Sequence, residues 1–310
     1  MRRIVLFGGS GFLGSRILSR LQQRSVIAPA RSRVDLTSLS DVTAFLQPGD
    51  LVINAAGYAE STARTPGEVA RLDSENVTAV ATLVEAAAGV GIGRLIHMSS
   101  VAAMGRLLGA EHDEESIGPI LSPYALSKYR AELLLDPLRS KLPVTTLRPT
   151  SVFGEGRGLT RALCRVCQLQ VIPLPGGGRA LIPFTYVGNV VEAVAIAVES
   201  ADPLNGTYIV GDDSSYPLRQ IVLTLSHHLG SNARVVPVPA WGVRALLAGS
   251  RAVGGRRAVL DDARIATLTT SVSYSIRRFR EATGYRPIHT IDGGLRNVAR
   301  WYAAGAAPIQ

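Results

Sequence analysis

A glycine-rich turn between an apolar strand and a helix is the feature that most constrains this chain. Residues 3–7 are mostly apolar, and Gly8-Gly9-Ser10-Gly11-Phe12-Leu13-Gly14 follows them directly. Such a run is typical of a parallel strand buried on both faces. Residues 11–23 then carry apolar side chains at helical spacing. Glycines at every third position let the backbone approach a pyrophosphate, to which the start of a helix offers unpaired N–H groups. In this context the pattern predicts a dinucleotide-binding site.

Apolar runs and helical spacing alternate along the chain after this turn. Strands are predicted at the apolar runs 26–29, 51–53, 94–98 and 144–147, and helices at 39–46, 68–88 and 124–138. Strands that alternate with helices form βαβ units. The first half of the chain is therefore expected to be an α/β fold with a doubly wound parallel sheet.

The alternation breaks after Gly154. The later segments are predicted as a helix at 159–169, a loop or hairpin at the Pro- and Gly-rich stretch 173–178, a helix at 187–199 and a strand at 207–210. Ligands of doubly wound sheets bind at the carboxyl ends of the strands, so a second domain is expected to cover that edge. We expect a dinucleotide-binding domain of residues 1–154 and 185–212, and a second, smaller, discontinuous substrate domain of residues 155–184 and 213–310.

Composition and charge exclude several classes of protein. The 310 residues are 46% hydrophobic and 18% charged, which excludes intrinsic disorder. Every apolar stretch is shorter than the ~18 residues of a spanning helix, and the N-terminal run is shorter than a signal-peptide core of roughly 7–15 residues. We therefore expect a cytoplasmic chain without a membrane partner.

The basic balance of the chain points to a small anionic ligand. The net charge is +9, and all but two of the 33 basic residues are arginines, scattered along the sequence. Basic runs with interleaved aromatic residues, which typify nucleic-acid binding, are lacking, so no nucleic-acid partner is expected. Cys164 and Cys167 form a lone CxxC pair without further ligands, so we expect core-lining side chains and no metal.

Further short motifs follow the glycine turn in a constant order. They are Asn54-Ala55-Ala56-Gly57, Asn76-Val77-Thr78, Ser99-Ser100 with Gly105, Ser122-Pro123-Tyr124-Ala125-Leu126-Ser127-Lys128, Leu147-Arg148-Pro149-Thr150-Ser151-Val152-Phe153-Gly154, residues 184–190 and residues 283–287. Over nearly the whole chain these motifs resemble those of the extended short-chain dehydrogenase/reductase family, in its nucleotide-sugar-modifying epimerase/dehydratase branch. Gly8 and Met104 depart from the Thr and Tyr usual there. The resemblance implies a Rossmann sheet, a nicotinamide cofactor and oxidoreductase chemistry.

Tyr124 and Lys128 are the candidate catalytic pair. They lie four residues apart on a predicted helix and therefore share a face. An ammonium group nearby favours the phenolate, so we expect Lys128 to lower the pKa of Tyr124 into a range useful for proton transfer. The resemblance implies that Ser100 binds the substrate carbonyl and that Lys128 also holds the nicotinamide ribose. Ser99 is the neighbouring candidate, but adjacent strand residues point to opposite faces, and we choose Ser100.

The resemblance also implies a set of cofactor contacts. They are Gly8, Ser10, Gly11, Phe12, Leu13, Gly14, Ala55, Ala56, Gly57, Asn76, Tyr124, Lys128 and Pro149. At the end of the second predicted strand, NAD enzymes place an acid on the ribose 2′-hydroxyl, whereas NADP enzymes offer arginine to the 2′-phosphate. Arg31 and Arg33 stand there, so NADP is expected. NAD stays the alternative, because Asp35 has the spacing of a ribose acid; Asp35-Leu36 also resembles the family's adenine-contacting pair.

Two histidines are expected to be structural. His97 lies inside a predicted strand and is interpreted as a satisfied core histidine. His112 falls among Glu111, Asp113, Glu114 and Glu115, a stretch interpreted as a solvated loop.

Two reactions fit these residues. The first is an NADPH-dependent ketoreductase that transfers hydride to a nucleotide-sugar or related ketone, with the proton from Tyr124. The alternative is a nucleotide-sugar epimerase with tightly bound NAD. Dehydration is disfavoured, because Ser100-Val101-Ala102 stands where the family's dehydratases carry acids. A protein that only senses nucleotides would lose the Tyr124 and Lys128 pair.

The substrate residues are given by resemblance alone. Ser151 stands where the family has a substrate-facing Asn. Arg179 lies three residues before Ile182, which occupies the place of the family's diphosphate-binding arginine. A nucleotide-sugar is the expected partner, a less polar ketone stays open, and so does a homodimer.

Overall fold

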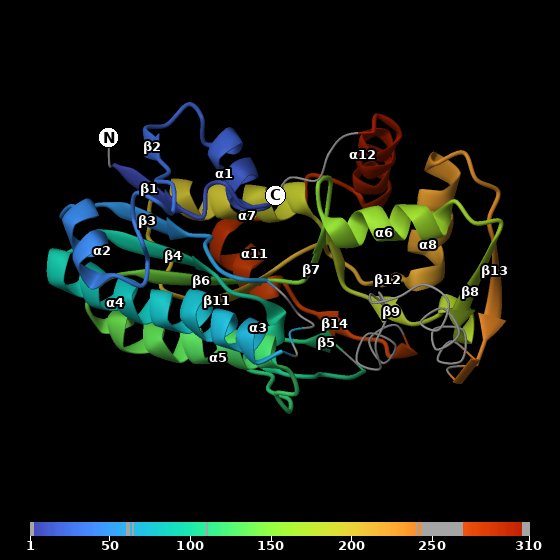
Figure 1. The fold of residues 1–310 in the computed structure, drawn as a ribbon, viewed down its shortest axis with the longest axis horizontal. Coiled ribbons are helices and arrows are strands. Elements are labelled where there is room, and N and C mark those ends of the chain that lie inside the picture. Colours follow the sequence, from blue (N-terminus) through green and yellow to red (C-terminus); the bar gives the residue numbers. More distant parts are fainter. Residues whose placement is uncertain are drawn as a thin grey trace.

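A six-stranded parallel sheet forms the centre of the molecule (Figure 1). The computed structural model describes residues 3–59, 63, 65–109, 111–239, 241–242 and 269–305. The strand order is β11-β6-β4-β3-β1-β2, and every neighbouring pair is parallel. The strands are β1 (Ile4–Phe7), β2 (Val26–Ile27), β3 (Leu51–Asn54), β4 (Arg94–Met98), β6 (Val144–Pro149) and β11 (Gly206–Val210). The expected doubly wound α/β sheet is confirmed.

Helices cover both faces of this sheet, which explains why its strands are apolar throughout. Figure 1 shows α1 (Gly14–Arg20) and α7 (Val187–Glu199) on one face, and α2 (Leu39–Phe45), α4 (Ala79–Val90) and α5 (Pro123–Leu135) on the other. Alternate residues of β1 enter different cores. Ile4 and Leu6 pack in the cluster that contains residues of α1 and α7, whereas Val5 and Phe7 pack in the cluster of α2, α4 and α5.

The helix expected over residues 68–88 is interrupted. It consists of α3 (Pro66–Leu72), a π-helical segment η1 (Asp73–Thr78) and α4. α3 begins with a capping box between Thr65 and Glu68. A π-helical turn inserts one residue into the helical path and often occurs at functional sites. Here it contains the buried side chain of Asn76.

Short strands and helices make up the rest of the described chain. The strand pairs are β7 (Ser151–Phe153) with β10 (Phe184–Tyr186), β8 (Val171–Pro175) with β13 (Arg234–Val238), β9 (Leu181–Ile182) with β12 (Tyr216–Pro217), and β5 (Glu111–His112) with β14 (Ser273–Tyr274). The helices are α6 (Gly158–Cys167), α8 (Leu218–His228), α11 (Arg277–Thr283) and α12 (Ile291–Ala303). Figure 1 shows α6, α8, β8 and β13 together at the end remote from β2.

Two local expectations need correction here. The loop or hairpin expected at 173–178 is in fact the end of β8 followed by a short 3-10 turn, η4 (Gly176–Gly178), and β8 pairs in parallel with the distant β13. The stretch around His112 is not wholly solvated. Glu114 is buried, and its carboxylate accepts a hydrogen bond from the Ile209 N–H at 2.8 Å.

The two cysteines line the core, as expected. Cys164 and Cys167 are both buried and unbonded in α6. Burial raises the pKa of Cys164 to about 11 and that of Cys167 to about 12. Among the described residues, no helix is long and apolar enough to cross a membrane, and no cluster of three metal-binding side chains occurs.

Candidate active site

The carboxyl ends of β1, β3 and β4 bring the glycine turn close to the loops that follow β3 and β4. The turn between β1 and α1 packs backbone against backbone. A Cβ atom on Gly8, whose φ is +81°, would lie 2.5 Å from the Ala56 nitrogen after β3. A Cβ atom on Gly14 would overlap the Gly8 carbonyl. Backbone atoms pack this turn closely, and α1 begins at Gly14 with Leu13 as an N-cap that makes no side-chain hydrogen bond. The first N–H groups of the helix are therefore left without a side-chain partner, as a pyrophosphate site requires. The donor set therefore fits a dinucleotide.

Ser100 and Tyr124 meet at the end of β4. Tyr124 lies in the first turn of α5, which begins with Ser122 as N-cap and Pro123 at its first position. The side chain of Ser100 lies near the Tyr124 phenol and acts to lower its pKa, and it accepts the Ala102 N–H at 3.1 Å.

Ser99 has a different partner. Its hydroxyl is buried and donates to the Glu132 carboxylate, two turns beyond Tyr124 on α5. The structure thus places Ser100, and not Ser99, against the tyrosine.

Lys128 lies one turn after Tyr124 and is only 7% exposed. Its Nζ donates to the Met98 carbonyl at 3.2 Å, and a Cβ on Gly57 would lie 3.5 Å from it. The ammonium therefore lies between the ends of β3 and β4. Burial lowers the pKa of Lys128 to about 8, against an opposing effect of the Glu132 charge.

The expected lowering of the Tyr124 pKa by Lys128 is wrong for this arrangement. Burial raises the pKa of Tyr124 above its ordinary value, and the groups that lower it are Ser100, by its hydrogen bond, and Arg157, by its charge. Desolvation of the phenolate outweighs both. The phenol is therefore held in its protonated form, ready to donate.

Arg157 is a site residue that the sequence reasoning missed. It precedes α6, donates to the Val152 carbonyl, and its guanidinium carbon lies 5.6 Å from the centroid of the Phe12 ring in the glycine turn. The guanidinium of Arg16 lies on the same ring at 4.6 Å. The sequence signal was the first cation after the motif that ends in Gly154.

Asn76 ties the loop after β3 to the catalytic helix. Its Nδ2 donates to the Tyr58 carbonyl at 2.9 Å and to the Ser127 hydroxyl at 3.0 Å. Its Oδ1 accepts the Tyr58 N–H at 2.8 Å. A Cβ on Gly57, which has φ +148°, would lie 2.6 Å from the same oxygen, so the loop needs glycine there.

The residues that follow β2 contact different parts of the molecule. Arg31 pairs with Glu75 of η1 at 2.8 Å, whereas the guanidinium of Arg33 lies 5.7 Å from the Phe45 ring centroid. Asp35 accepts hydrogen bonds from the Thr37 N–H and hydroxyl. Leu36 packs against the core cluster of α2, α4 and α5. Arg31 therefore contacts a carboxylate that sequence reasoning did not single out.

A buried ion pair joins the catalytic helix α5 to strand β6. Arg148 at the end of β6 binds both carboxylate oxygens of Glu132, at 2.7 Å for the shortest contact. It also donates to the Glu114 carbonyl at 2.8 Å. The two side chains are 13% and 8% exposed.

The expected substrate residues lie on the surface. Ser151 is exposed on β7, and Arg179 is exposed after η4. Ile182 is 2% exposed and packs in the core. The place of the family's diphosphate-binding arginine is thus filled by an apolar side chain.

His97 is a core histidine, and one of its two ring nitrogens has a polar neighbour within hydrogen-bond distance. Its Nδ1 is 3.2 Å from the Asn54 amide nitrogen. Its Nε2 has no hydrogen-bond partner among the residues that the structure describes. Burial, with the nearby charges of Lys128 and Arg139, lowers the pKa of His97 to about 3, so the ring is neutral.

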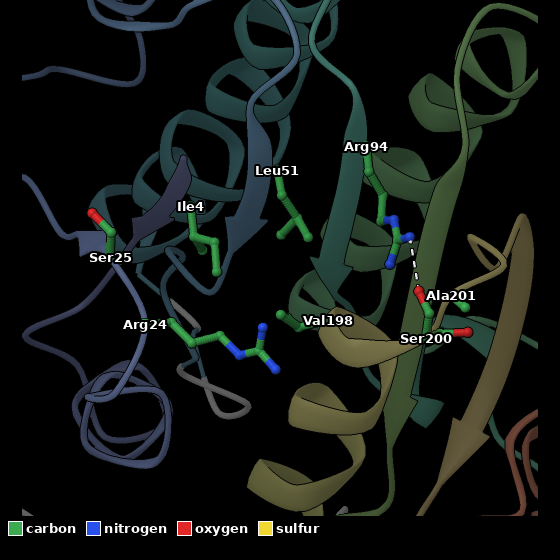
Figure 2. A pocket seen from close by; sticks show the side chains of 8 residues that line it. All are labelled: Ile4, Arg24, Ser25, Leu51, Arg94, Val198, Ser200 and Ala201. Carbon is green, nitrogen blue, oxygen red and sulfur yellow. Dashed lines mark hydrogen bonds between the residues drawn. The ribbon is translucent and has the colours of Figure 1, made fainter. Parts of the chain in front are cut away.

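A cavity of about 260 Å³ lies at the opposite edge of the sheet, near the amino ends of β1, β3 and β4 (Figure 2). Figure 2 shows Arg94 directed toward Ser200, to whose carbonyl it donates, as it does to that of Ala197. Arg94 thus satisfies carbonyls at the C-terminal end of α7. The cavity is remote from the catalytic residues and is lined by Ile4, Arg24, Ser25, Leu51, Arg94, Val198, Ser200 and Ala201.

Comparison with known proteins identifies the family of the chain. The model of the NAD dependent epimerase/dehydratase family matches residues 4–211. The chain is 25% identical to the UDP-glucose 4-epimerase of Vibrio cholerae, over 96% of this chain and 95% of that protein. It is 26% identical to the 4-hydroxy-2-methyl-3-oxo-4-farnesyl-3,4-dihydroquinoline-1-oxide ketoreductase of Stigmatella aurantiaca, over 78% of each chain.

Two solved structures share the fold. MoeE5 in complex with UDP-glucuronic acid and NAD superposes with a TM-score of 0.76 at 21% identity, covering 98% of this chain and 100% of that one. RMD from Pseudomonas aeruginosa complexed with NADPH gives a TM-score of 0.75 at 22% identity, covering 99% and 100%.

Proposed function

Because the chain belongs to the NAD-dependent epimerase/dehydratase family, within the extended short-chain dehydrogenases/reductases, we propose that it is an NADPH-dependent ketoreductase. Its substrate would be a keto group of a nucleotide-sugar or a related small ketone. The observation that carries this proposal is the grouping of Ser100, Tyr124 and Lys128 at the strand ends beside the glycine turn.

This grouping can deliver a proton to a carbonyl oxygen. The hydroxyls of Ser100 and Tyr124 lie near each other, so a carbonyl oxygen placed between them would accept from both. Tyr124 stays protonated because its pKa is raised, and it is the proton donor. Arg157 stabilises the phenolate that results, since its positive charge lowers the pKa of Tyr124. When bound, a nicotinamide cofactor supplies hydride chemistry.

The residues that would hold this cofactor form a continuous path. The glycine turn would hold the pyrophosphate, Ala55, Ala56 and Gly57 would lie beneath it, and Lys128 would hold the nicotinamide ribose. Pro149, which is buried at the end of β6, would line the nicotinamide end. Asn76 would keep the loop after β3 in place through its bonds to Tyr58.

NADPH is proposed over NADH because Arg31 follows β2 with its side chain 68% exposed, although paired with Glu75, whereas Asp35 is engaged with Thr37. A solved structure of the same fold is described as complexed with NADPH, which supports the choice. An arginine at this position suits a 2′-phosphate, whereas an acid suits a free 2′-hydroxyl.

The proposed substrate class follows from the relatives. A nucleotide-sugar is named for the Vibrio epimerase and for the MoeE5 complex, and a ketone reaction for the Stigmatella enzyme. In this proposal, residues 155–184 and 213–310 supply the substrate side with Arg179 at its surface, and Ser151 on β7 faces it from the dinucleotide-binding part.

The test is to supply purified protein with NADPH and a panel of 4-keto nucleotide-sugars and small ketones. We expect loss of NADPH absorbance matched by formation of the alcohol, and no turnover with Tyr124→Phe. The whole-length similarity to a 4-epimerase favours a second candidate, a nucleotide-sugar epimerase. Protein that is purified with one equivalent of NAD and interconverts two epimers without net cofactor consumption would replace the ketoreductase with that candidate.

A further inference from the structure

Glu75 lies between two arginines at the edge where the residues after β2 approach η1. Its Oε1 accepts from Arg31 Nη1 at 2.8 Å and from Arg71 Nε at 2.8 Å. The Arg71 guanidinium carbon also lies 4.1 Å from the centroid of the Tyr58 ring. Two cations thus share one carboxylate.

The carboxylate of Glu75 is more buried than its two arginine partners. Its side chain is 15% exposed, whereas that of Arg31 is 68% exposed. Glu75 directly precedes Asn76, whose amide binds Tyr58 and Ser127, so the π-helical turn fixes its place. Burial acts to raise the pKa of Glu75, but the hydrogen bonds from Arg31 and Arg71 outweigh it and leave the pKa below its ordinary value. The carboxylate is charged at neutral pH.

This edge is next to the glycine turn. A Cβ atom on Gly9 would lie 2.7 Å from the Ala28 Cβ, just after β2. In doubly wound folds a dinucleotide that lies across such a turn presents the 2′ position of its adenosine to the residues after the second strand. Arg31 follows Ala28 by three residues and carries the Glu75 carboxylate with it.

The charge of Glu75 has opposite effects on the affinities for a 2′-phosphorylated cofactor and for one with a free 2′-hydroxyl. A phosphate monoester carries about −1.5 to −2 charges at neutral pH, so Arg31 attracts it and Glu75 repels it. A free 2′-hydroxyl can instead donate a hydrogen bond to a carboxylate. Removal of the Glu75 charge should therefore strengthen binding of a 2′-phosphate and weaken binding of a 2′-hydroxyl.

We infer that Glu75 is a specificity-determining residue, which positions Arg31 at the adenosine edge and limits the preference for a 2′-phosphorylated cofactor. The inference rests on the proposed function in one respect, namely that a dinucleotide binds across the glycine turn. It does not depend on which substrate is reduced.

The test compares two probes that differ only in the phosphate of interest, adenosine 2′,5′-bisphosphate and adenosine 5′-monophosphate. Their dissociation constants are measured by calorimetry at one ionic strength for the parent chain and its variants. Glu75→Gln should raise the preference for the bisphosphate by about tenfold, the scale expected for one charge near a partly exposed phosphate. Arg31→Gln should lower that preference by a similar factor, because it removes the charge that attracts the 2′-phosphate.

Two further variants separate positioning from general charge. Asp73→Asn makes the same charge change within η1, on a carboxylate that pairs with Arg130 at 2.7 Å, and should alter the preference by less than about twofold. Because the Glu75 charge itself repels the phosphate, the double variant Arg31→Gln with Glu75→Gln should regain part of the preference lost in Arg31→Gln. An unchanged preference in Glu75→Gln, or an equal rise in Asp73→Asn, overturns the inference.

Failure of the proposed function gives a different result. The probes lack nicotinamide, so a chain that shows the Glu75→Gln shift but reduces no ketone keeps this inference and loses the ketoreductase. A chain that reduces ketones but binds both probes equally in every variant loses this inference alone.

Discussion

Replacement of Lys128 by methionine should make the folded chain more stable at neutral pH while it damages the site. Burial is the largest cause that lowers the Lys128 pKa from 10.5 to about 8. At 1.36 kcal/mol per pKa unit, the buried ammonium costs the folded state about 3 kcal/mol. Loss of the hydrogen bond from Nζ to the Met98 carbonyl reduces the gain in stability by about 1 kcal/mol. We therefore expect a net gain of about 2 kcal/mol, since methionine fills much of the same space without charge.

The pH dependence of this gain identifies its cause. Below about pH 8, Lys128 is protonated in both the folded and the unfolded chain, so the full cost is present. Between about 8 and 10.5 the unfolded chain binds the proton that the folded chain has released, so the stability of the parent rises with pH. The advantage of Lys128→Met should therefore shrink across this window and turn into a deficit of about 1 kcal/mol above it, where only the lost hydrogen bond counts.

The measurement is urea unfolding of parent and variant at about pH 7 and about pH 10. Lys141→Met is the matched control, because Lys141 is exposed and is the only other lysine. A Lys128→Met chain that is less stable than the parent at neutral pH would refute the reasoning. So would a difference that is the same at both pH values.

Three further substitutions probe the same helix and its surroundings. Tyr124→Phe should abolish ketone reduction but leave the affinity for adenine nucleotides within about twofold in calorimetry, because only the proton-donating oxygen is removed. Arg157→Gln should raise the pKa of Tyr124 further, since it removes a charge that lowers it; the alkaline limb of the kcat profile should move to higher pH, and Arg157→Lys should restore it. Arg148→Met should cost about 3–5 kcal/mol of unfolding free energy in urea, because it leaves the Glu132 carboxylate buried without its cation. Combining it with Glu132→Leu should recover most of that loss, and failure to do so would count against the ion pair as the cause.

The central sheet was predictable because its information is local. Apolar runs such as 94–98 and 51–53 are strands buried on both faces, and the glycine turn marks where the first of them ends. The spacing of Tyr124 and Lys128 placed them on one face of a helix, and the structure has them one turn apart on α5. These features depend on neighbours in the sequence.

Features that depend on distant neighbours were not predictable. The π-helical turn at Asp73–Thr78 adds one residue to a helix, which hardly alters its hydrophobic spacing. Glu114 looked solvated because the N–H that it binds belongs to Ile209, on another strand. The direction of the Tyr124 pKa required its burial and the position of Arg157, neither of which follows from the spacing of Tyr124 and Lys128.

The labelling rate of the two buried cysteines measures how often the part of the chain around them opens. Cys164 and Cys167 lie on α6, their thiols are held neutral by burial, and they pack in the core cluster that also contains residues of α8. A thiol reagent attacks thiolate, so modification must wait until α6 separates from α8. No other cysteine occurs in the sequence. The rate of labelling therefore reports exclusively on that part of the molecule, and comparison with global unfolding would show whether it opens before the six-stranded sheet does.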